Sequence, residues 1–413
     1  MSSNRSAPAI PGIIVAVGVV AACYAWAVIV LTPTHPGSIG LNLNALGTDF
    51  MVFHTGARWF FGGRLDALFD GTGFTEYLNA AFAGWLSQPI AFRPWVYPPS
   101  YLLLMLPLGA LPFVTAYASF QLLTAAVLAI ALWHVSRREV RVPVMAVALL
   151  GPAAAINAGM GQNAFLTSAL IVAGFGLRPT RPLVGGAILG LLTAKPQFWP
   201  LVPIALIAMR DWRALTAAIA AAVMLAGVSA AVFGLGAWQH WLELARASYA
   251  DPNGEWMELG RLWGGSVYAC LATAGAPPAL ASAGQAAASI TGAATVFLTF
   301  RAALPPNSRI AIVLAATVLT APHTSLSDTA LLGTAAALWA GELAKAGVPL
   351  AHWTLALAVW IAALVNPPVL SPVGRLTPLL LLAFVAVVLT GARRLPAFSS
   401  GVAPTWRRAA SED

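Results

Sequence analysis

The feature that most constrains this chain is a series of apolar runs that begins near residue 10 and continues, with short breaks, to residue 390. The first run, residues 10–31, is long enough to cross a bilayer as a helix, which takes about 20 residues. Hydrophobic residues make up 59% of the sequence and charged residues 9%, whereas soluble domains average about 45–50% and about 25%. The sequence therefore predicts an all-α integral membrane protein and excludes a cytosolic enzyme or a nucleic-acid-binding module.

The basic residues indicate how the runs are oriented, because Arg and Lys favour the cytoplasmic ends of membrane helices. Arg5 precedes the first run, so this run is expected to start in the cytoplasm. Placing the later basic turns inside as well predicts a bundle of about twelve spans with both termini in the cytoplasm. These turns contain Arg137, Arg138, Arg141, Arg178, Arg181, Arg210, Arg213, Arg301, Arg309 and Lys345. The net charge of +8 is thus explained by basic residues at the cytoplasmic ends of the helices and does not indicate a nucleic-acid partner.

The same scheme divides the chain into one membrane-embedded domain, residues 1–390, and a basic cytoplasmic tail, residues 391–413. Two outer loops are expected, a large one at 32–98 after the first span and a second one at 235–262.

Two apolar segments have an uncertain path through the membrane. Pro107, Gly109 and Pro112 interrupt the stretch 99–135, so 99–112 is expected to be partly inserted and 113–135 to cross. The alternative, two spans in 99–135, would place the following three arginines outside. Residues 263–278 are not expected to cross fully.

Several paired runs are too short to cross a membrane completely. Residues 182–194, 197–209 and 309–322 each provide only 13 or 14 residues. The turns at their outer ends should therefore lie below the membrane surface and line a cavity, since such backbone is tolerated at depth only against protein or water. The outer turns also carry the polar residues of functional kind, namely Asp49, Gln162, Asn163, Lys195, Gln197, His323 and Asp328. We expect the chemistry on the periplasmic or exterior face of the cell membrane.

Asp49 opens a predicted helix in the large outer loop. Apolar residues at Phe50, Phe53, Ala57 and Phe60 share one helical face, and Gly62 with Gly63 ends the element. The pattern is typical of a short amphipathic helix in the interface plane. Asp49 has two interpretations that can both hold: an N-cap of this helix, or a general base at the edge of a membrane cavity.

Alternatives remain open for the other polar residues. Lys195 either snorkels from a short span or supplies a cation to a substrate. His323 is either an ordinary buried histidine or a donor to a ligand, with Asp328 five residues later able to orient it or to cap a helix. Gln162 and Asn163 either cap the following span or bind sugar hydroxyls.

Near the end of the large loop, Tyr97 is either an interfacial aromatic anchor, like Trp95, or a substrate-binding residue, as Gln197 is expected to be. Cys23 and Cys270 lie in apolar stretches and are expected to be free thiols. The remaining histidines have no spacing typical of a metal site, and the sequence contains no Asp-x-Asp pair, so neither a metal nor another cofactor is expected. These histidines are His35, His134, His240 and His352.

Five short motifs occur along the chain in a fixed order. They are Gly47-Thr48-Asp49-Phe50, Tyr97-Pro98-Pro99, Gly161-Gln162-Asn163, Lys195-Pro196-Gln197, and Pro322-His323 followed by Asp328. Together they resemble glycosyltransferase family 87, integral membrane mannosyltransferases of the GT-C superfamily, over roughly residues 10–390. The sequence departs from the family at Gly264-Gly265-Ser266, where Asn-Gln-Ser is frequent, and at Ser327, where Tyr is frequent. These differences concern the acceptor and the sugar.

The resemblance implies a GT-C fold, an essential acid that maps onto Asp49, and a polyprenyl-phosphate-linked donor, as in the polyprenyl-phosphate-mannose-dependent α-(1,2)-mannosyltransferases. The partners would be this donor, a lipid or glycan acceptor, and membrane lipids. A phosphate leaving group needs no general acid, so Asp49 as base would suffice for single-step inversion. Lys195, His323 and Arg58 are candidates to meet the charge on the phosphate.

A transporter or lipid flippase is the main alternative, since many spans around a polar cavity suit both functions. A membrane assembly or scaffold protein is a further one. The polar turns cluster on one face and the long loop occurs once, which favours the glycosyltransferase.

Overall fold

The computed structural model describes residues 12–30, 45–250, 264–344, 349–365 and 372–394. Within these ranges the regular structure consists of α-helices and short 3₁₀ helices, with no strands, so the all-α prediction is confirmed. Arg5, Lys345, the first part of the large outer loop and most of the basic tail lie outside the described residues.

The helices follow one another closely along the chain. The α-helices are α1 (Gly12–Val30), α2 (Thr48–Phe61), α3 (Gly71–Ala81), α4 (Pro99–Gly109), α5 (Phe113–Val135), α6 (Arg141–Leu150), α7 (Pro152–Met160), α8 (Ala164–Leu177), α9 (Pro182–Gly190), α10 (Leu201–Ala208), α11 (Trp212–Ala250), α13 (Val267–Thr273), α14 (Pro278–Arg301), α15 (Pro306–Thr320), α16 (Ala330–Leu343), α17 (Leu350–Ile361) and α18 (Thr377–Arg394). The 3₁₀ helices are η1 (Leu65–Phe69), η2 (Leu191–Ala194), η3 (Pro196–Phe198), η4 (Leu326–Thr329), η5 (Ala362–Leu364) and η6 (Pro372–Leu376).

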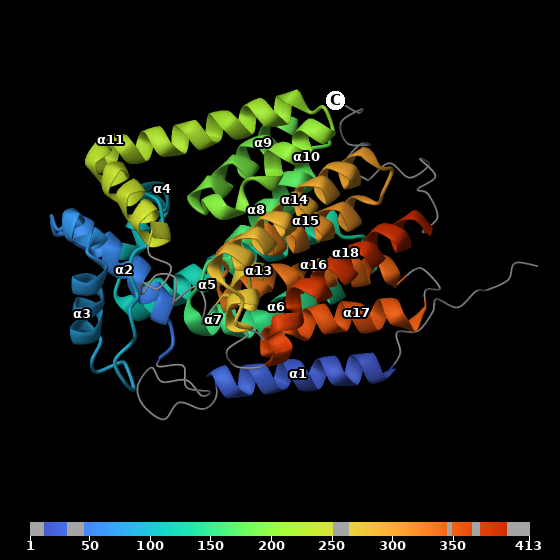
Figure 1. The fold of residues 1–413 in the computed structure, drawn as a ribbon, viewed down its shortest axis with the longest axis horizontal. Coiled ribbons are helices and arrows are strands. Elements are labelled where there is room, and N and C mark those ends of the chain that lie inside the picture. The colour runs from blue at the N-terminus through green and yellow to red at the C-terminus, as the bar shows by residue number, and fades with distance from the viewer. Residues whose placement is uncertain (1–11, 31–44, 251–263, 345–348, 366–371, 395–413) are drawn as a thin grey trace, which may run out of the picture.

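Most helices form one bundle, and the outer-loop helices gather at one end of it (Figure 1). At that end α2, α3 and α4 lie beside the last part of α11, which packs on α4 and η1. Helix α1 lies along the edge of the bundle against α7 and α17.

Among the described residues, three helices are long and apolar enough to cross a membrane: α5, α14 and α11 up to residue 247. Helices α6 and α7 together provide a fourth candidate, bent by 52° at Gly151. Eight further apolar segments have 10–17 residues. The structure is that of a multi-pass membrane protein, but the predicted count of about twelve spans is not confirmed.

Several local predictions are met. Helix α5 covers residues 113–135, as expected, and α4 is a separate piece of 11 residues before it. The spacing of Gly186 and Gly190 in the sequence is typical of a helix contact through small residues, and in α9 both glycines lie against the backbone carbonyls of Ala214 and Ala218 in α11. A methyl group at either glycine would overlap these carbonyl oxygens, so α9 and α11 approach through small residues.

Two segments of the expected outer loops differ in local structure from the prediction. Residues 235–250 were expected in a loop but continue helix α11 beyond a kink at Gly234, where φ is 81°. Trp241 donates a hydrogen bond to the Val96 carbonyl over 3.2 Å, which holds this segment against the large outer loop. Helix α2 was expected in the interface plane, but its residues 48–57 are all buried within the protein.

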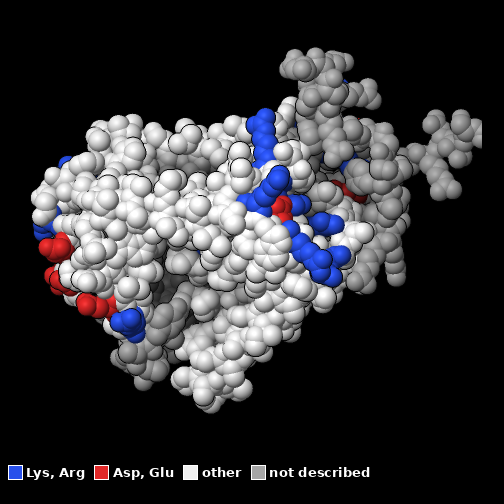
Figure 2. Space-filling model, turned by 90° about the horizontal axis from the view of Figure 1, so that it is seen from above, with Lys and Arg blue, Asp and Glu red and all other residues white. Residues whose placement is uncertain are grey.

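The charged residues on the face that Figure 2 displays gather toward two regions separated by an uncharged surface. Acidic residues, with some basic ones, occur at the end that carries α2 and α3. Basic residues dominate the other region. Between the α8–α9 turn and the start of α11, Arg178 pairs with Asp211 at 2.8 Å. This separation fits a protein that places its arginine-rich turns on one side of a membrane.

Candidate active site

A cavity of about 960 Å³ lies where the outer-loop helices meet the bundle. It is lined by α2, by the loop that precedes α4, by α10, α11 and α14, and by three of the turns that the sequence marked as functional. Both polar and apolar residues form its walls. The four charged side chains of the lining are Asp49, Arg93, Lys195 and Asp328.

Asp49 lies in the first turn of α2 and is nearly buried, with 10% of its side chain exposed. Its Oδ1 forms a close ion pair with Arg93 Nη1, and its Oδ2 accepts a hydrogen bond of 3.0 Å from Gln162 Nε2. The N-cap position of α2 belongs to Gly47, and no side chain caps the helix. The N-cap interpretation of Asp49 is therefore wrong, because both carboxylate oxygens bind other side chains.

Two glycines in left-handed conformations bring Asp49 to Gln162. Gly47 has φ 74° and Gly161 has φ 73°, and the Gly47 N–H donates to the Gly159 carbonyl over 2.7 Å. A Cβ at Gly161 would lie 2.6 Å from Phe50 Cβ, so only glycine permits this close approach. The motif that contains Asp49 and the motif that contains Gln162 are therefore in direct contact.

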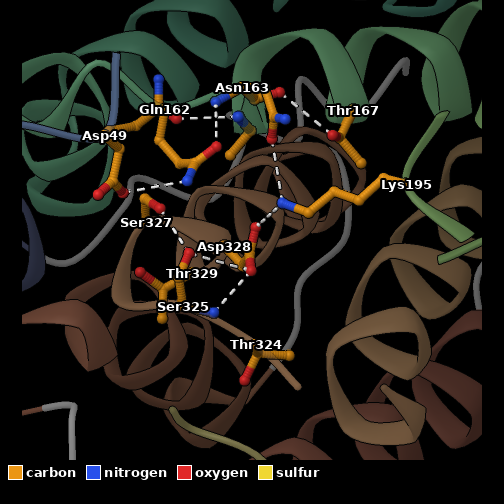
Figure 3. A network of polar contacts seen from close by, with 12 residues as sticks. Asp49, Gln162, Asn163, Thr167, Lys195, Thr324, Ser325, Ser327, Asp328 and Thr329 are labelled. Atoms are coloured by element: carbon orange, nitrogen blue, oxygen red, sulfur yellow. Dashed lines mark hydrogen bonds and ion pairs between the residues drawn. The ribbon is translucent and has the colours of Figure 1, made fainter. Parts of the chain in front are cut away.

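Gln162 and Asn163 connect the two charged pairs of the cavity (Figure 3). Gln162 Oε1 accepts from Tyr97 Oη at 3.0 Å and from the Asn163 N–H at 2.9 Å. Asn163 occupies the N-cap position of α8 without a side-chain cap, and its Oδ1 instead accepts from Lys195 Nζ at 3.0 Å. The capping alternative for this pair is therefore wrong.

Lys195 is buried, which excludes the snorkelling alternative. Its Nζ binds Asp328 Oδ1 at 2.5 Å and lies 4.7 Å from the centre of the Phe198 ring. Asp328 is also a capping residue: its Oδ2 accepts from the Ser325 N–H at 2.7 Å at the start of η4. Because both side chains are buried, removing one of them would leave the other as an unpaired buried charge and destabilise the protein.

The remaining expected residues divide into two groups. Tyr97, Gln197 and His323 line the cavity. Burial raises the pKa of the Tyr97 phenol well above its usual value, so this hydroxyl stays a donor. His323 lies in the turn after α15, and burial lowers its pKa, which favours the neutral imidazole.

Arg58 does not reach the cavity. It is exposed on the far side of α2, where it lines a separate surface pocket with Gly62 and Leu111. Its helical neighbour His54 is buried and hydrogen-bonds to the Leu111 carbonyl at 2.9 Å. The structure therefore does not place Arg58 with the other expected site residues.

The sequence analysis missed Arg93, Asn157 and Gln121. Asn157 Oδ1 accepts from the Ala164 N–H at 2.9 Å and so takes the capping role that was expected of its neighbours. Gln121 in α5 donates to the Gln162 carbonyl at 3.0 Å. Arg93 had one available signal, since it directly precedes the Pro94-Trp95 pair in the loop that carries Tyr97.

Within the described ranges, no three His, Cys, Asp or Glu side chains gather into a group that could hold a metal ion. Charge at the site is instead balanced inside the protein. Each acid of the cavity faces one base, so the cavity has two ion pairs and a bridge of amides between them. A carboxylate with fixed partners beside an open cavity is suited to accept a proton from a bound hydroxyl.

Comparison with known proteins gives one finding. The sequence model of glycosyltransferase family 87 matches residues 95–322, more than half of the chain. This region contains Tyr97, Gln162, Asn163 and Lys195, and the contacts above join it to Asp49. No curated protein and no solved structure matches the chain. The chain is a multi-pass helical protein, and the turns that carry these motifs meet at a polar cavity. It belongs to glycosyltransferase family 87 and is a membrane glycosyltransferase.

Proposed function

We propose that the chain transfers a sugar from a polyprenyl-phosphate donor to a lipid-linked or glycan acceptor at the outer face of the cell membrane, with inversion at the anomeric carbon. Mannose is the expected sugar, by resemblance to the family. The bundle would be a GT-C arrangement formed by residues 1–390. Family membership favours this function over the transporter or flippase alternative.

The observation that carries the proposal is the position of Asp49 in the cavity wall. Its two oxygens have fixed partners in Arg93 and Gln162, so the carboxylate is held in one orientation beside open space. In the proposed step Asp49 takes the proton of the acceptor hydroxyl. The hydroxyl oxygen bonds to the anomeric carbon, and the bond from that carbon to the phosphate oxygen breaks with its electron pair going to the phosphate.

The size and composition of the cavity support a lipid-linked substrate. Its volume of about 960 Å³ lies near the upper end of the usual range for ligand sites, about 300–1,000 Å³. Its wall includes Leu201 and Ile204 of α10, Leu244 of α11 and Ala293 of α14. These apolar side chains can contact a prenyl chain, while the amides of Gln162 and Gln197 can bind sugar hydroxyls.

The test is transfer of radiolabelled sugar by purified protein in lipid nanodiscs. Polyprenyl-phosphate mannose, glucose and arabinose are offered separately, with membrane glycolipids as acceptors, and the anomeric configuration of the product is determined by NMR. We expect transfer of mannose with inversion, and none by Asp49→Asn. Equal transfer by both proteins, or retention of configuration, would contradict the proposal.

A further inference from the structure

Arg93 is held in the cavity wall by its main chain. Its N–H donates to Thr75 Oγ1 over 2.9 Å, and the Thr75 hydroxyl donates to the Gly71 carbonyl over 2.7 Å at the start of α3. The residue lies in the loop between α3 and α4 and lines the same cavity as Asp49. Helix α3 therefore fixes the point from which the Arg93 side chain reaches Asp49.

The guanidinium of Arg93 has unused hydrogen-bonding capacity. It carries five N–H groups, and among the described residues its acidic partner is Asp49, which binds Nη1. Its Nε is fully buried and has no hydrogen-bond partner among the described residues, although 22% of the side chain is exposed. The side chain therefore has donors to spare for a ligand oxygen that reaches its exposed part.

Lys195, the cation that the sequence suggested for the phosphate, is in the opposite situation. Two of its three N–H groups bind Asn163 Oδ1 and Asp328 Oδ1, and only 6% of its side chain is exposed. Its ammonium is thus held by the wall of the cavity. The planar guanidinium, with donors on two edges, also matches a phosphate better than an ammonium does.

From these contacts we infer that Arg93 is the residue that binds the phosphate of the donor, and that it holds this phosphate and Asp49 at the same time. The inference rests on the proposed function and names the group that recognises the anionic part of the donor. Nη1 stays on Asp49, and Nη2, which has no partner among the described residues and is not sealed off as Nε is, binds the phosphate oxygens. The Arg93 side chain then contacts both the base, Asp49, and the leaving group, the donor phosphate.

The charge balance of the reaction explains why such a bridge would accelerate it. Before transfer, the Asp49 carboxylate neutralises Arg93. As the acceptor proton moves to Asp49, this carboxylate becomes neutral, and the departing phosphate becomes a monoester dianion in the same step. Arg93 therefore loses one counter-charge when the other develops, so its bond to the phosphate strengthens in the transition state. The Lys195–Asp328 pair keeps its charges throughout.

The experiment measures binding and transfer separately in nanodiscs. Polyprenyl phosphate without sugar is the binding probe, and polyprenyl-phosphate mannose is the substrate. The variants are Arg93→Gln, Arg93→Lys and Lys195→Gln. The matched control is Arg64→Gln, because Arg64 belongs to the same group of outer helices but is exposed, stacks on Trp59 and Tyr77, and does not line the cavity. Thermal unfolding and gel filtration check that each variant is folded.

We expect Arg93→Gln to weaken binding of polyprenyl phosphate by about 10- to 150-fold, the usual effect of losing hydrogen bonds to a charged group. Its turnover should fall by about 10²- to 10³-fold. Arg93→Lys should recover part of both, because it restores the charge without the planar fork, and Arg64→Gln should match the wild type.

Two results would overturn the inference. If Arg93→Gln transfers poorly but binds polyprenyl phosphate as well as the wild type, Arg93 serves only to hold Asp49. If Lys195→Gln, and not Arg93→Gln, loses the binding, Lys195 is the phosphate cation. A wild type that binds polyprenyl phosphate through Arg93 but transfers no sugar would instead contradict the proposed function and support the inference.

Discussion

Asp49 binds Arg93 and Gln162 and is also the proposed base, and one substitution can separate these two roles. Asparagine at position 49 can still accept a hydrogen bond from Gln162 through its amide oxygen, but it cannot take a proton from an acceptor. Asp49→Asn is therefore expected to fold and to lower turnover by about two to four orders of magnitude. Turnover is measured with saturating donor, and folding by thermal unfolding.

The control for this prediction is Asp70→Asn. Asp70 caps α3 by accepting from the Gly73 N–H at 3.1 Å, and it is exposed and outside the cavity. Asparagine is nearly as good an N-cap, so this variant should match the wild type. Similar turnover in both variants would leave Asp49 without a catalytic role.

Lys195 and Asp328 form a pair whose members depend on one another. Lys195→Ala leaves the Asp328 carboxylate, 2% exposed, without its counter-charge, and should lower the free energy of unfolding by about 3–5 kcal/mol. The double variant Lys195→Met, Asp328→Asn removes both charges and should recover most of that loss. Chemical denaturation of the three proteins provides the measurement. A double variant less stable than Lys195→Ala would show that the charges themselves stabilise this wall.

The polar residues near the cavity could be found from the sequence because they occur in short turns between apolar runs. Their partners could not. Arg93 is 44 residues from Asp49, and Asp328 is 133 residues from Lys195, so both pairs depend on how the helices pack. The N-cap interpretation of Asp49 was wrong because a glycine in a left-handed conformation took that position.

At the scale of elements, the contact between Gly47 and Gly161 should be sensitive to a single methyl group. Gly161→Ala places a Cβ 2.6 Å from Phe50 Cβ and 3.1 Å from Gly47 Cα. Helix α2 must then move away from the turn before α8, which separates Asp49 from Gln162. We expect loss of transfer and a lower unfolding temperature.

Gly63→Ala is the matched control for this contact. Gly63 also has a positive φ, 69°, but nothing lies within 4 Å of the position that its Cβ would take. Both substitutions therefore cost backbone strain, about 1–3 kcal/mol, and only Gly161→Ala adds the overlap. Equal effects on stability and on transfer would show that the close approach is unimportant.

Elements were predictable where local patterns determine them. The spacing of Gly186 and Gly190 predicted a close helix contact, and the proline before Phe113 marked the start of α5. The continuation of α11 beyond Gly234 was not predictable, because residues 235–250 carry the polar and aromatic residues of a loop. Contacts across the fold hold this segment in place, including the tilted rings of His240 and Phe69, whose centres lie 5.7 Å apart.

For the whole molecule, the separation of charged regions predicts an orientation that labelling can test. Single cysteines are introduced as Arg64→Cys and Arg138→Cys in a variant without Cys23 and Cys270. Both sites are exposed. In intact cells an impermeant thiol reagent should label position 64 only, and in permeabilised cells it should label both. Labelling of position 138 from outside would reverse the orientation or change the number of crossings between them.

The prediction of an all-helical membrane protein followed from the composition of the whole chain. Its high apolar content does not depend on where individual helices begin and end. The number of spans did not follow, because many helices are broken by proline or glycine into pieces shorter than a bilayer. Helices α6 and α7 show this directly: Gly151 and Pro152 divide one apolar run into two helices bent by 52°. Counting apolar runs therefore gives an architecture but no exact topology.

The long separation between Lys195 and Asp328 also has a consequence for biosynthesis. Synthesis proceeds from the N-terminus, so a nascent chain contains the Lys195 ammonium 133 residues before the carboxylate that pairs with it. Until then the charge sits among apolar helices at a cost of several kcal/mol, and α9 and α10 cannot settle in their final positions. An incomplete chain should therefore stay loosely assembled and open to chaperones and membrane proteases. Synthesis of Asp328 is thus the step after which the ion pair between two walls of the cavity can form and the chain can complete its packing.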